Sequence, residues 1–285
     1  MAQRVQVNPQ LPPRPKSGHK GTFGRVLVVG GNEAMIGAPV LAGTAALRMG
    51  AGLVQIAMPK AVLASAMSVT PELIGLPLGK SLREMLAAAE VADAIIIGPG
   101  MGQHPDAKSR LMRLVTLEKP MVIDADGLNL LAAQKRWPTS FKARAVLTPH
   151  PGEMTRLNRL LKRDKTPGDE QGRIDNAVVA AKAQGGFGQV VVLKGERTVV
   201  TDGQRVYVND TGNSALSKAG TGDVLSGMLG ALIAQGMDRF DAACVAVRLH
   251  GLAGEIAGET LGLRSVLARD VINAIPEAIR RCEEP

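Results

Sequence analysis

Four consecutive residues, Gly220-Thr221-Gly222-Asp223, combine a backbone suited to phosphate with a carboxylate side chain. They open an apolar run, 224–233, that predicts a helix. The two glycines let the backbone approach a ligand closely, and the next N–H groups carry the positive end of the helix dipole without partners inside the helix. This pattern predicts a site for an anion, most naturally a phosphate. A carboxylate beside a phosphate is electrostatically unfavourable, so its presence there indicates a chemical role. We expect Asp223 to accept a proton from a substrate hydroxyl.

Polar or glycine-rich residues also follow five apolar runs that predict buried strands. Ligands of open α/β sheets bind at the carboxyl ends of the strands, so five such ends in one chain indicate a single binding crevice. The five segments are Gly30-Gly31, 98–102, Asp124-Ala125-Asp126, 148–153 and Lys194-Gly195.

Several of these side chains have two interpretations. Lys194 could meet a phosphate as a point charge or lie in a solvated turn. His150 stands between Pro149 and Pro151, and its place beside Glu153 favours a functional role over a structural one. Glu153 could instead serve the first turn of the next helix.

The segment Asp124-Ala125-Asp126 offers two carboxylates, and Asn129 follows it. Either aspartate could cap the next helix or hold Mg²⁺ through water. For Asp126 we favour capping, and we expect Asn129 to lie in the crevice. Two familiar nucleotide motifs are excluded: the chain has no G-x-x-x-x-G-K-[ST] run, and Gln103 stands where a dinucleotide fingerprint needs its third glycine.

The elements that must position these residues alternate between strands and helices, which predicts a mostly parallel sheet covered on both faces. Expected strands are 25–29, 53–58, 94–97, 121–124, 145–147, 190–193, 198–201 and 205–208, with the last two forming an antiparallel hairpin at one edge. Expected helices are 36–49, 61–69, 82–91, 105–117, 127–133, 151–161, 171–184, 221–235, 238–258 and 268–281. We expect a surface loop at 162–172, one domain over 25–285, and a Pro-rich basic arm over 1–24.

Composition narrows the class of ligand. Hydrophobic residues make up 45% of the 285 residues, but aromatic residues only 2%, so the core must be aliphatic. The net charge of +8 could attract nucleic acid, yet single-strand readers need stacking aromatics, so a phosphate-bearing small molecule is the better expectation. Cys244 and Cys282 lack metal-ligand spacing, and no signal peptide or membrane span is visible, so we expect idle thiols in a cytoplasmic protein.

Seven segments, in order over about residues 11–281, resemble the ADP/ATP-dependent NAD(P)H-hydrate dehydratases, a branch of the ribokinase-like superfamily. They are HKGTFGRVLVVGG (19–31), GAPVLAGTAALRMGAGLV (37–54), IIIGPGMG (95–102), VIDADGLNLL (122–131), LTPHPGEM (147–154), LKGERTVV (193–200) and GNSALSKAGTGDVLSGML (212–229). The resemblance implies a ribokinase-like three-layer sandwich and a lyase, specifically a hydro-lyase that repairs the S-epimer of NADH or NADPH hydrate. A phosphoryl group from ADP or ATP would pass to the C6 hydroxyl, and elimination of phosphate would restore NAD(P)H and leave AMP or ADP.

The resemblance also assigns roles to residues. Asp223 would be the catalytic base, and the N–H groups of 219–222, including those of Gly220 and Gly222, would form an anion hole. Nucleotide binding would fall to Lys194, Gly195, Glu196, Arg197, Thr198, Asn213, Thr221 and Gly222. The hydrate pocket would be lined by Ala38, Gly100, Gly102, His150 and Asp223. Mg²⁺ would bridge the nucleotide phosphates and need few protein ligands, with Asp124 and Glu153 within reach through water.

The chain departs from the family pattern just before the Gly220–Asp223 motif. Ser214 and Ala215 replace Pro and Gly of the usual GNPG, and Lys218 replaces a small hydroxyl residue; Gly127 also stands where Ala is common. Lys218 could add positive charge near the phosphates or point to solvent. These changes bear on the choice between ADP and ATP more than on the reaction class.

Two other functions fit the same motif. One is a kinase of the same superfamily that phosphorylates a small alcohol such as a vitamin precursor, and the other is a non-catalytic nucleotide sensor. Asp223 speaks against the sensor, because a carboxylate beside bound phosphate hinders binding. An epimerase domain often precedes this domain in the family, so the short arm implies a separate epimerase; a homo-oligomer, often a tetramer, is also implied.

Overall fold

A computed structural model describes residues 2–6, 10–79, 81–163, 166–182, 184 and 186–283. Within those residues ten strands form one sheet in the order β1-β10-β9-β8-β7-β6-β5-β2-β3-β4. All neighbouring strands from β4 to β8 are parallel, whereas β9 is antiparallel to both β8 and β10. The strands are β1 Gln3–Arg4, β2 Arg25–Val29, β3 Leu53–Pro59, β4 Ile74–Leu78, β5 Ala94–Ile97, β6 Pro120–Ile123, β7 Arg144–Leu147, β8 Val190–Leu193, β9 Val199–Thr201 and β10 Arg205–Val208.

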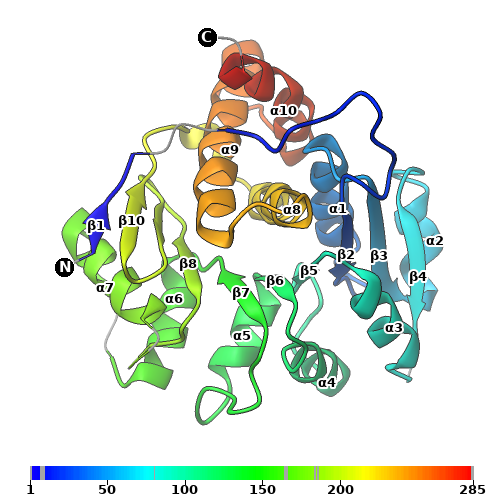
Figure 1. Cartoon of the computed structure of the whole chain (residues 1–285), viewed down its shortest axis with the longest axis horizontal. Coiled ribbons are helices and arrows are strands. Elements are labelled where there is room, and N and C mark those ends of the chain that lie inside the picture. Colours follow the sequence, from blue (N-terminus) through cyan, green and yellow to red (C-terminus); the bar gives the residue numbers. More distant parts are fainter. Residues whose placement is uncertain are drawn as a thin grey trace.

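Helices cover both faces of this sheet, as expected (Figure 1). One layer contains α1 Gly37–Arg48, α2 Lys60–Met67, α8 Thr221–Ala234, α9 Arg239–Leu261 and α10 Ala268–Glu283. The other contains α3 Arg83–Val91, α4 Pro105–Leu114, α5 Asp126–Ala132, α6 Pro151–Asn158 and α7 Glu170–Ala181. Two short 3₁₀ turns, η1 Arg159–Leu161 and η2 Ser214–Leu216, complete the elements.

The core is aliphatic, and α8 is its central helix. Alternate residues of each strand face the two layers, so that Ile96 of β5 packs toward α8 while Ile95 and Ile97 pack toward the opposite layer. Helix α8 lies on β2, β5 and β6 and is flanked by α1 and α9, so nearly all its side chains are buried (Figure 1). This packing holds the N-terminus of α8 near the carboxyl ends of the central strands.

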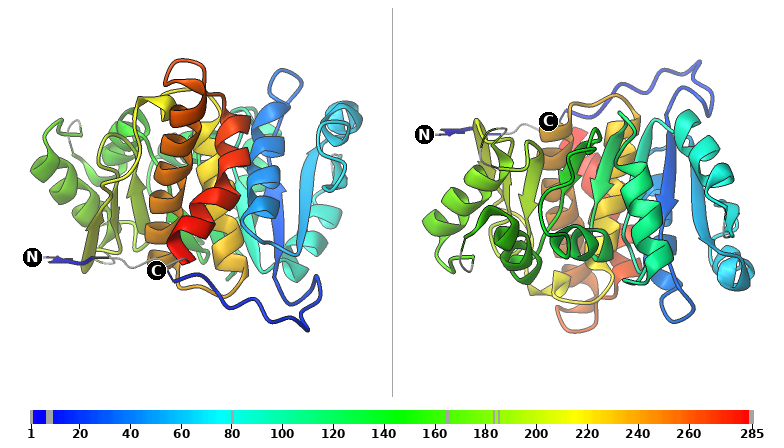
Figure 2. Two further views of the ribbon diagram at one scale, coloured as in Figure 1. Left: turned by 90° about the horizontal axis from the view of Figure 1, so that it is seen from above. Right: turned by 90° about the horizontal axis from the view of Figure 1, so that it is seen from below.

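The sequence missed two strands. Gly75 and Pro77 argue against a strand at β4, but β4 is an edge strand, where proline costs no ladder hydrogen bond on its open side. Strand β1 has only two residues and no sequence signal; it adds to the outside of the predicted hairpin, parallel to β10. Figure 2 shows the N-terminal segment running past the C-terminal end of α10 before it enters β2.

The other expected strands and helices are present, but several end at different residues than predicted; the helix expected over 171–184, for example, ends at Ala181, and residue 183 lies outside the described chain. The 162–172 segment is a loop at 162–163 and 166–169, with residues 164 and 165 outside the described chain, and α7 begins earlier than expected, at Glu170. Cys244 and Cys282 are both free thiols. None of the helices in the described ranges is both long and apolar enough to cross a bilayer.

Candidate active site

One end of the sheet carries the carboxyl ends of the parallel strands β2, β5, β6, β7 and β8. The N-terminus of α8 lies against this end of the sheet. The strand order reverses between β2 and β5, and open α/β sheets bind ligands at such a reversal. The two loops at this point touch, because the Gly31 N–H donates to the Pro99 carbonyl over 2.9 Å.

Asp124, at the end of β6, joins three elements. Its Oδ1 accepts a hydrogen bond from Lys194 Nζ at 2.7 Å, and its Oδ2 accepts one from Ser226 Oγ of α8 at 2.7 Å. Only 1% of Asp124 is exposed. Burial alone would raise the pKa of Asp124, but the Lys194 ammonium and the hydrogen bonds lower it overall. Asp124 therefore stays a carboxylate that fixes β8 and α8 to β6, and it does not cap α5, whose N-cap position is Ala125.

Lys194, at the end of β8, is not in a solvated turn. Its side chain is 19% exposed, and its ammonium lies 4.0 Å from Glu153 Oε2 in addition to its bond with Asp124. These carboxylates raise the pKa of Lys194 despite the opposing effect of burial. A Cβ atom added to Gly222 would lie 3.4 Å from Nζ, so the ammonium is adjacent to the first turn of α8.

Asp223 lies in that first turn. Its N-cap, Gly220, has φ +93°, and a Cβ there would approach Leu41 Cδ1 to 2.8 Å, so only glycine fits. In the described part of the chain the N–H groups of Gly222 and Asp223 donate to no acceptor. Burial, followed by the charge of Asp124, raises the pKa of Asp223 to about 7. A carboxyl group with this pKa can take up a proton near neutral pH.

The glycine loop after β5 lies close to Ala38 and to the β6–α5 loop. A Cβ on Gly98 would come within 1.8 Å of the Asp124 carbonyl, so this loop lies directly on the β6–α5 loop. A Cβ on Gly100 would lie 3.2 Å from the Cβ of Ala38 at the start of α1. The Gly102 N–H donates to Asp126 Oδ2 at 2.9 Å.

The expected capping role of Asp126 was wrong, whereas His150 does cap a helix. Asp126 is the first residue of α5, and its side chain holds the Gly102 loop instead of capping its own helix. His150 is the N-cap of α6: its Nδ1 accepts from the Gly152 N–H at 3.0 Å and the Glu153 N–H at 3.4 Å, while Glu153 Oε2 accepts the His150 N–H. This capping box is the structural role that we ranked second for His150.

The predicted nucleotide-binding loop, Lys194–Thr198, is held by Arg173 of α7. The buried Arg173 guanidinium donates to the carbonyls of Leu193, Lys194 and Glu196. Arg197 instead pairs with Glu170 at 2.5 Å on the surface. Sequence reasoning missed Arg173, because nothing in its own segment shows that α7 lies beneath this loop.

The side chains of Asn213 and Thr221 form hydrogen bonds within the turn that leads into α8. Asn213 Oδ1 accepts from the Ala215 N–H at 2.9 Å, and Thr221 Oγ1 donates to the carbonyls of Leu216 and Lys218. Lys218 is exposed, and its Nζ donates to the Arg264 carbonyl at 2.6 Å.

His250 of α9 is a second residue that the sequence did not single out. It is 8% exposed and hydrogen-bonded to the Thr221 backbone, and among the described residues its Nε2 has no partner. Burial lowers the pKa of His250 to about 4.

We expect this buried imidazole to make stability depend on pH. Between pH 6.5 and about 4 the unfolded chain binds a proton at His250 that the folded chain does not, so the free energy of unfolding falls as pH falls through this window, by about 3 kcal/mol for one such group. Urea unfolding of the wild type and of His250→Gln at several pH values measures how much of the pH dependence of the free energy of unfolding is due to His250. All other titratable groups are the same in the two proteins, so their contributions cancel in the comparison. Parallel curves for the two proteins would contradict the prediction.

The described residues contain no cluster of three His, Cys, Asp or Glu side chains that could hold a metal ion. Both Asp124 oxygens already accept protein hydrogen bonds, so Asp124 is poorly suited to bind a metal directly. A metal ion here would have to take most of its ligands from phosphate and water.

Comparison with known proteins identifies the family of this chain. The profile of the NAD(P)H-hydrate dehydratase family matches residues 26–277. The bifunctional NAD(P)H-hydrate repair enzyme of Moorella thermoacetica is 41% identical over 96% of this chain and 53% of its own length, so this chain spans about half of that relative. The ADP-dependent (S)-NAD(P)H-hydrate dehydratase of Neisseria meningitidis is 38% identical over 89% of this chain and 84% of its own.

A solved structure is similar over nearly its whole length. The ADP/ATP-dependent NAD(P)H-hydrate dehydratase of Bacillus subtilis, co-crystallized with ATP/Mg²⁺, has a TM-score of 0.81 and 31% identity, covering 95% of this chain and 94% of its own. This match confirms the expected ribokinase-like sandwich. The chain therefore belongs to the NAD(P)H-hydrate dehydratase family.

Proposed function

We propose that this chain dehydrates the S-epimer of NADH or NADPH hydrate, with ADP or ATP as phosphoryl donor. The observation that carries the proposal is Asp223, a carboxyl group with its pKa raised to about 7, in the first turn of α8, where N–H groups donate to no acceptor in the described chain, and beside the Lys194 ammonium. A base, an anion site and a cation meet there, as phosphoryl transfer to a hydroxyl requires.

In this mechanism Asp223 removes the proton from the C6 hydroxyl of the hydrate. The oxygen attacks the terminal phosphorus of the nucleotide; the new P–O bond forms as the bond to AMP or ADP breaks. The N–H groups at the start of α8 stabilise the charge on the transferred group. The C6–O bond then breaks, phosphate leaves with the bonding electrons, and loss of the C5 proton restores the double bond. Mg²⁺, carried by the nucleotide phosphates, would neutralise part of their charge.

The site residues fall into two groups in this proposal. The nucleotide would bind at Lys194–Thr198, Asn213, Thr221 and Gly222, and the hydrate at Ala38, Gly100, Gly102, His150 and Asp223. Asn213 and Thr221 would act through their backbone, since their side chains are used within the turn. We further propose a separate epimerase as the supplier of the S-epimer, a cytoplasmic location and a homo-oligomer.

Recovery of NADH absorbance tests the function. Purified protein is mixed with hydrated NADH, Mg²⁺ and either ADP or ATP, with a sample lacking nucleotide as the control. We expect recovery that depends on nucleotide and yields phosphate. The ratio of the two rates identifies the donor. No recovery with either nucleotide would exclude the dehydratase, and a stable phosphorylated alcohol as product would identify the alternative, a small-alcohol kinase.

A further inference from the structure

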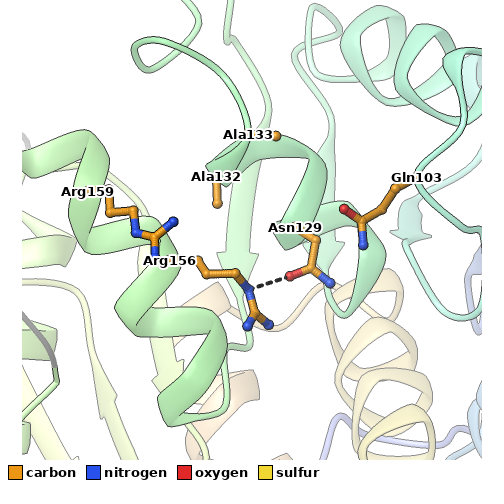
Figure 3. A pocket seen from close by; sticks show the side chains of 6 residues that line it. All are labelled: Gln103, Asn129, Ala132, Ala133, Arg156 and Arg159. Carbon is orange, nitrogen blue, oxygen red and sulfur yellow. Dashed lines mark hydrogen bonds between the residues drawn. The ribbon is translucent and has the colours of Figure 1, made fainter.

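A cavity of about 410 Å³ opens between α5 and the α6–η1 segment. Figure 3 shows the side chains of Arg156 and Arg159 on one side of it, with Asn129 of α5 and Gln103 of the β5–α4 loop on the other. The residues that line it are Gln103, Asn129, Ala132, Ala133, Arg156 and Arg159. The wall therefore carries two guanidinium groups and no carboxylate.

Among the described residues, no acidic side chain neutralises either arginine. Arg156 Nε donates to Asn129 Oδ1 at 2.9 Å, which leaves both of its terminal nitrogens for a ligand. Within the ranges that the structure describes, neither Arg156 nor Arg159 pairs with an acidic side chain. Two unpaired guanidinium groups in one cavity suit a phosphate, which the planar fork binds through two parallel hydrogen bonds.

A chain of hydrogen bonds connects this cavity to the hydrate-site residues. Asn129 bridges Arg156 to Asp126, with its Nδ2 3.4 Å from Asp126 Oδ1, and Asp126 in turn accepts from the Gly102 N–H. On the other side, a Cβ added to Gly152 would lie 3.2 Å from His150 Nδ1 and 3.8 Å from Arg156 Nη1. The cavity thus adjoins both Gly102 and His150.

We propose that Arg156 and Arg159 bind a phosphate group of the dinucleotide substrate. The inference rests on the proposed function, because it takes the nicotinamide half to lie at Gly102, His150 and Asp223. The rest of such a substrate carries a pyrophosphate, and in NADPH hydrate also a 2′-phosphate on the adenosine. The donor nucleotide has its own phosphate-binding groups at Lys194 and α8. The cavity lined by Arg156 and Arg159 is therefore left for a phosphate group of the dinucleotide substrate.

Steady-state kinetics of Arg156→Gln, Arg159→Gln and the double variant test the proposal, with Arg113→Gln of α4, an exposed arginine outside the cavity, as the control. Loss of a charged hydrogen bond costs about 1.5–3 kcal/mol, so KM for the hydrate should rise about tenfold or more in Arg156→Gln and further in the double variant. A rise for NADH and NADPH hydrate alike identifies the pyrophosphate, and a rise for NADPH hydrate alone identifies the 2′-phosphate. We expect kcat, KM for ADP and the melting temperature to stay near those of the wild type.

Unchanged KM values for both hydrates in the double variant would overturn the proposal, and so would a rise confined to KM for ADP. Calorimetric binding of NAD⁺ and NADP⁺ separates this result from the fate of the proposed function, because it needs no turnover. If the wild type fails to dehydrate either hydrate, weaker binding of these dinucleotides by Arg156→Gln still supports a phosphate site, and equal binding overturns it.

Discussion

Asp223→Asn is expected to lower kcat by about a thousandfold or more, within the range for loss of a general base. Asparagine has the size of aspartate but cannot take the proton from the substrate hydroxyl. It also removes a negative charge beside the bound phosphate, so nucleotide binding should be unchanged or tighter. Single-turnover kinetics and nucleotide titration measure the two effects separately.

The raised pKa of Asp223 gives this prediction a pH dependence. The base form is needed, so the wild-type kcat/KM should fall as pH falls through about 7. Asp106→Asn is a matched control, because Asp106 also lies in the first turn of a helix but is exposed and outside the site. Activity that survives in Asp223→Asn would exclude Asp223 as the base.

The same substitution should stabilise the protein. The pKa of Asp223 is higher in the folded chain, about 7, than its ordinary value of 3.8, so its ionisation lowers the free energy of unfolding as pH rises from about 4 to 7, and the full penalty is present above pH 7. The difference corresponds to at most about 4 kcal/mol, and the partial exposure of Asp223 reduces this to about 2 kcal/mol. A gain in the free energy of unfolding that is larger at pH 8 than at pH 5 is the expected result.

The sequence predicted the parts of the site that are encoded locally. Two glycines before a helix and an acid in its first turn are visible in four residues, and the structure places Gly220 and Asp223 at the N-terminus of α8. The strand ends were predictable for a similar reason, since each buried run stops at glycine or a polar residue. What the sequence could not show is which of these ends touch.

The pair Lys194–Asp124 illustrates that limit. The two residues are 70 positions apart in the sequence. They meet because the strand order is β8-β7-β6 and because both residues follow the carboxyl ends of their parallel strands. Arg173 and His250 were missed because each lies inside a helix and acts on a different element. The capping role of His150 is one that the sequence did signal: proline at the first helical position marks an N-cap before it, and His104-Pro105 repeats the arrangement at α4.

Lys194→Met is expected to destabilise the protein by about 3–5 kcal/mol, the cost of removing one partner from a buried ion pair. Asp124 and Glu153 are both buried, and without the ammonium they would face each other and Asp223 with no cation between them. Urea unfolding at pH 7 measures the loss. Lys194→Arg retains the charge and serves as the matched variant, with a much smaller effect.

A double-mutant cycle with Asp124→Asn separates the ion pair from other roles of Lys194. If Lys194 acts mainly by compensating Asp124, the double variant should be more stable than the sum of the single changes predicts, by at least about 1 kcal/mol. Its nucleotide KM should nevertheless stay high, because the cation beside Gly222 is still missing. Additive stabilities would contradict the ion-pair role. A normal nucleotide KM in Lys194→Met would contradict the role in phosphate binding, so the two functions of this lysine can fail independently.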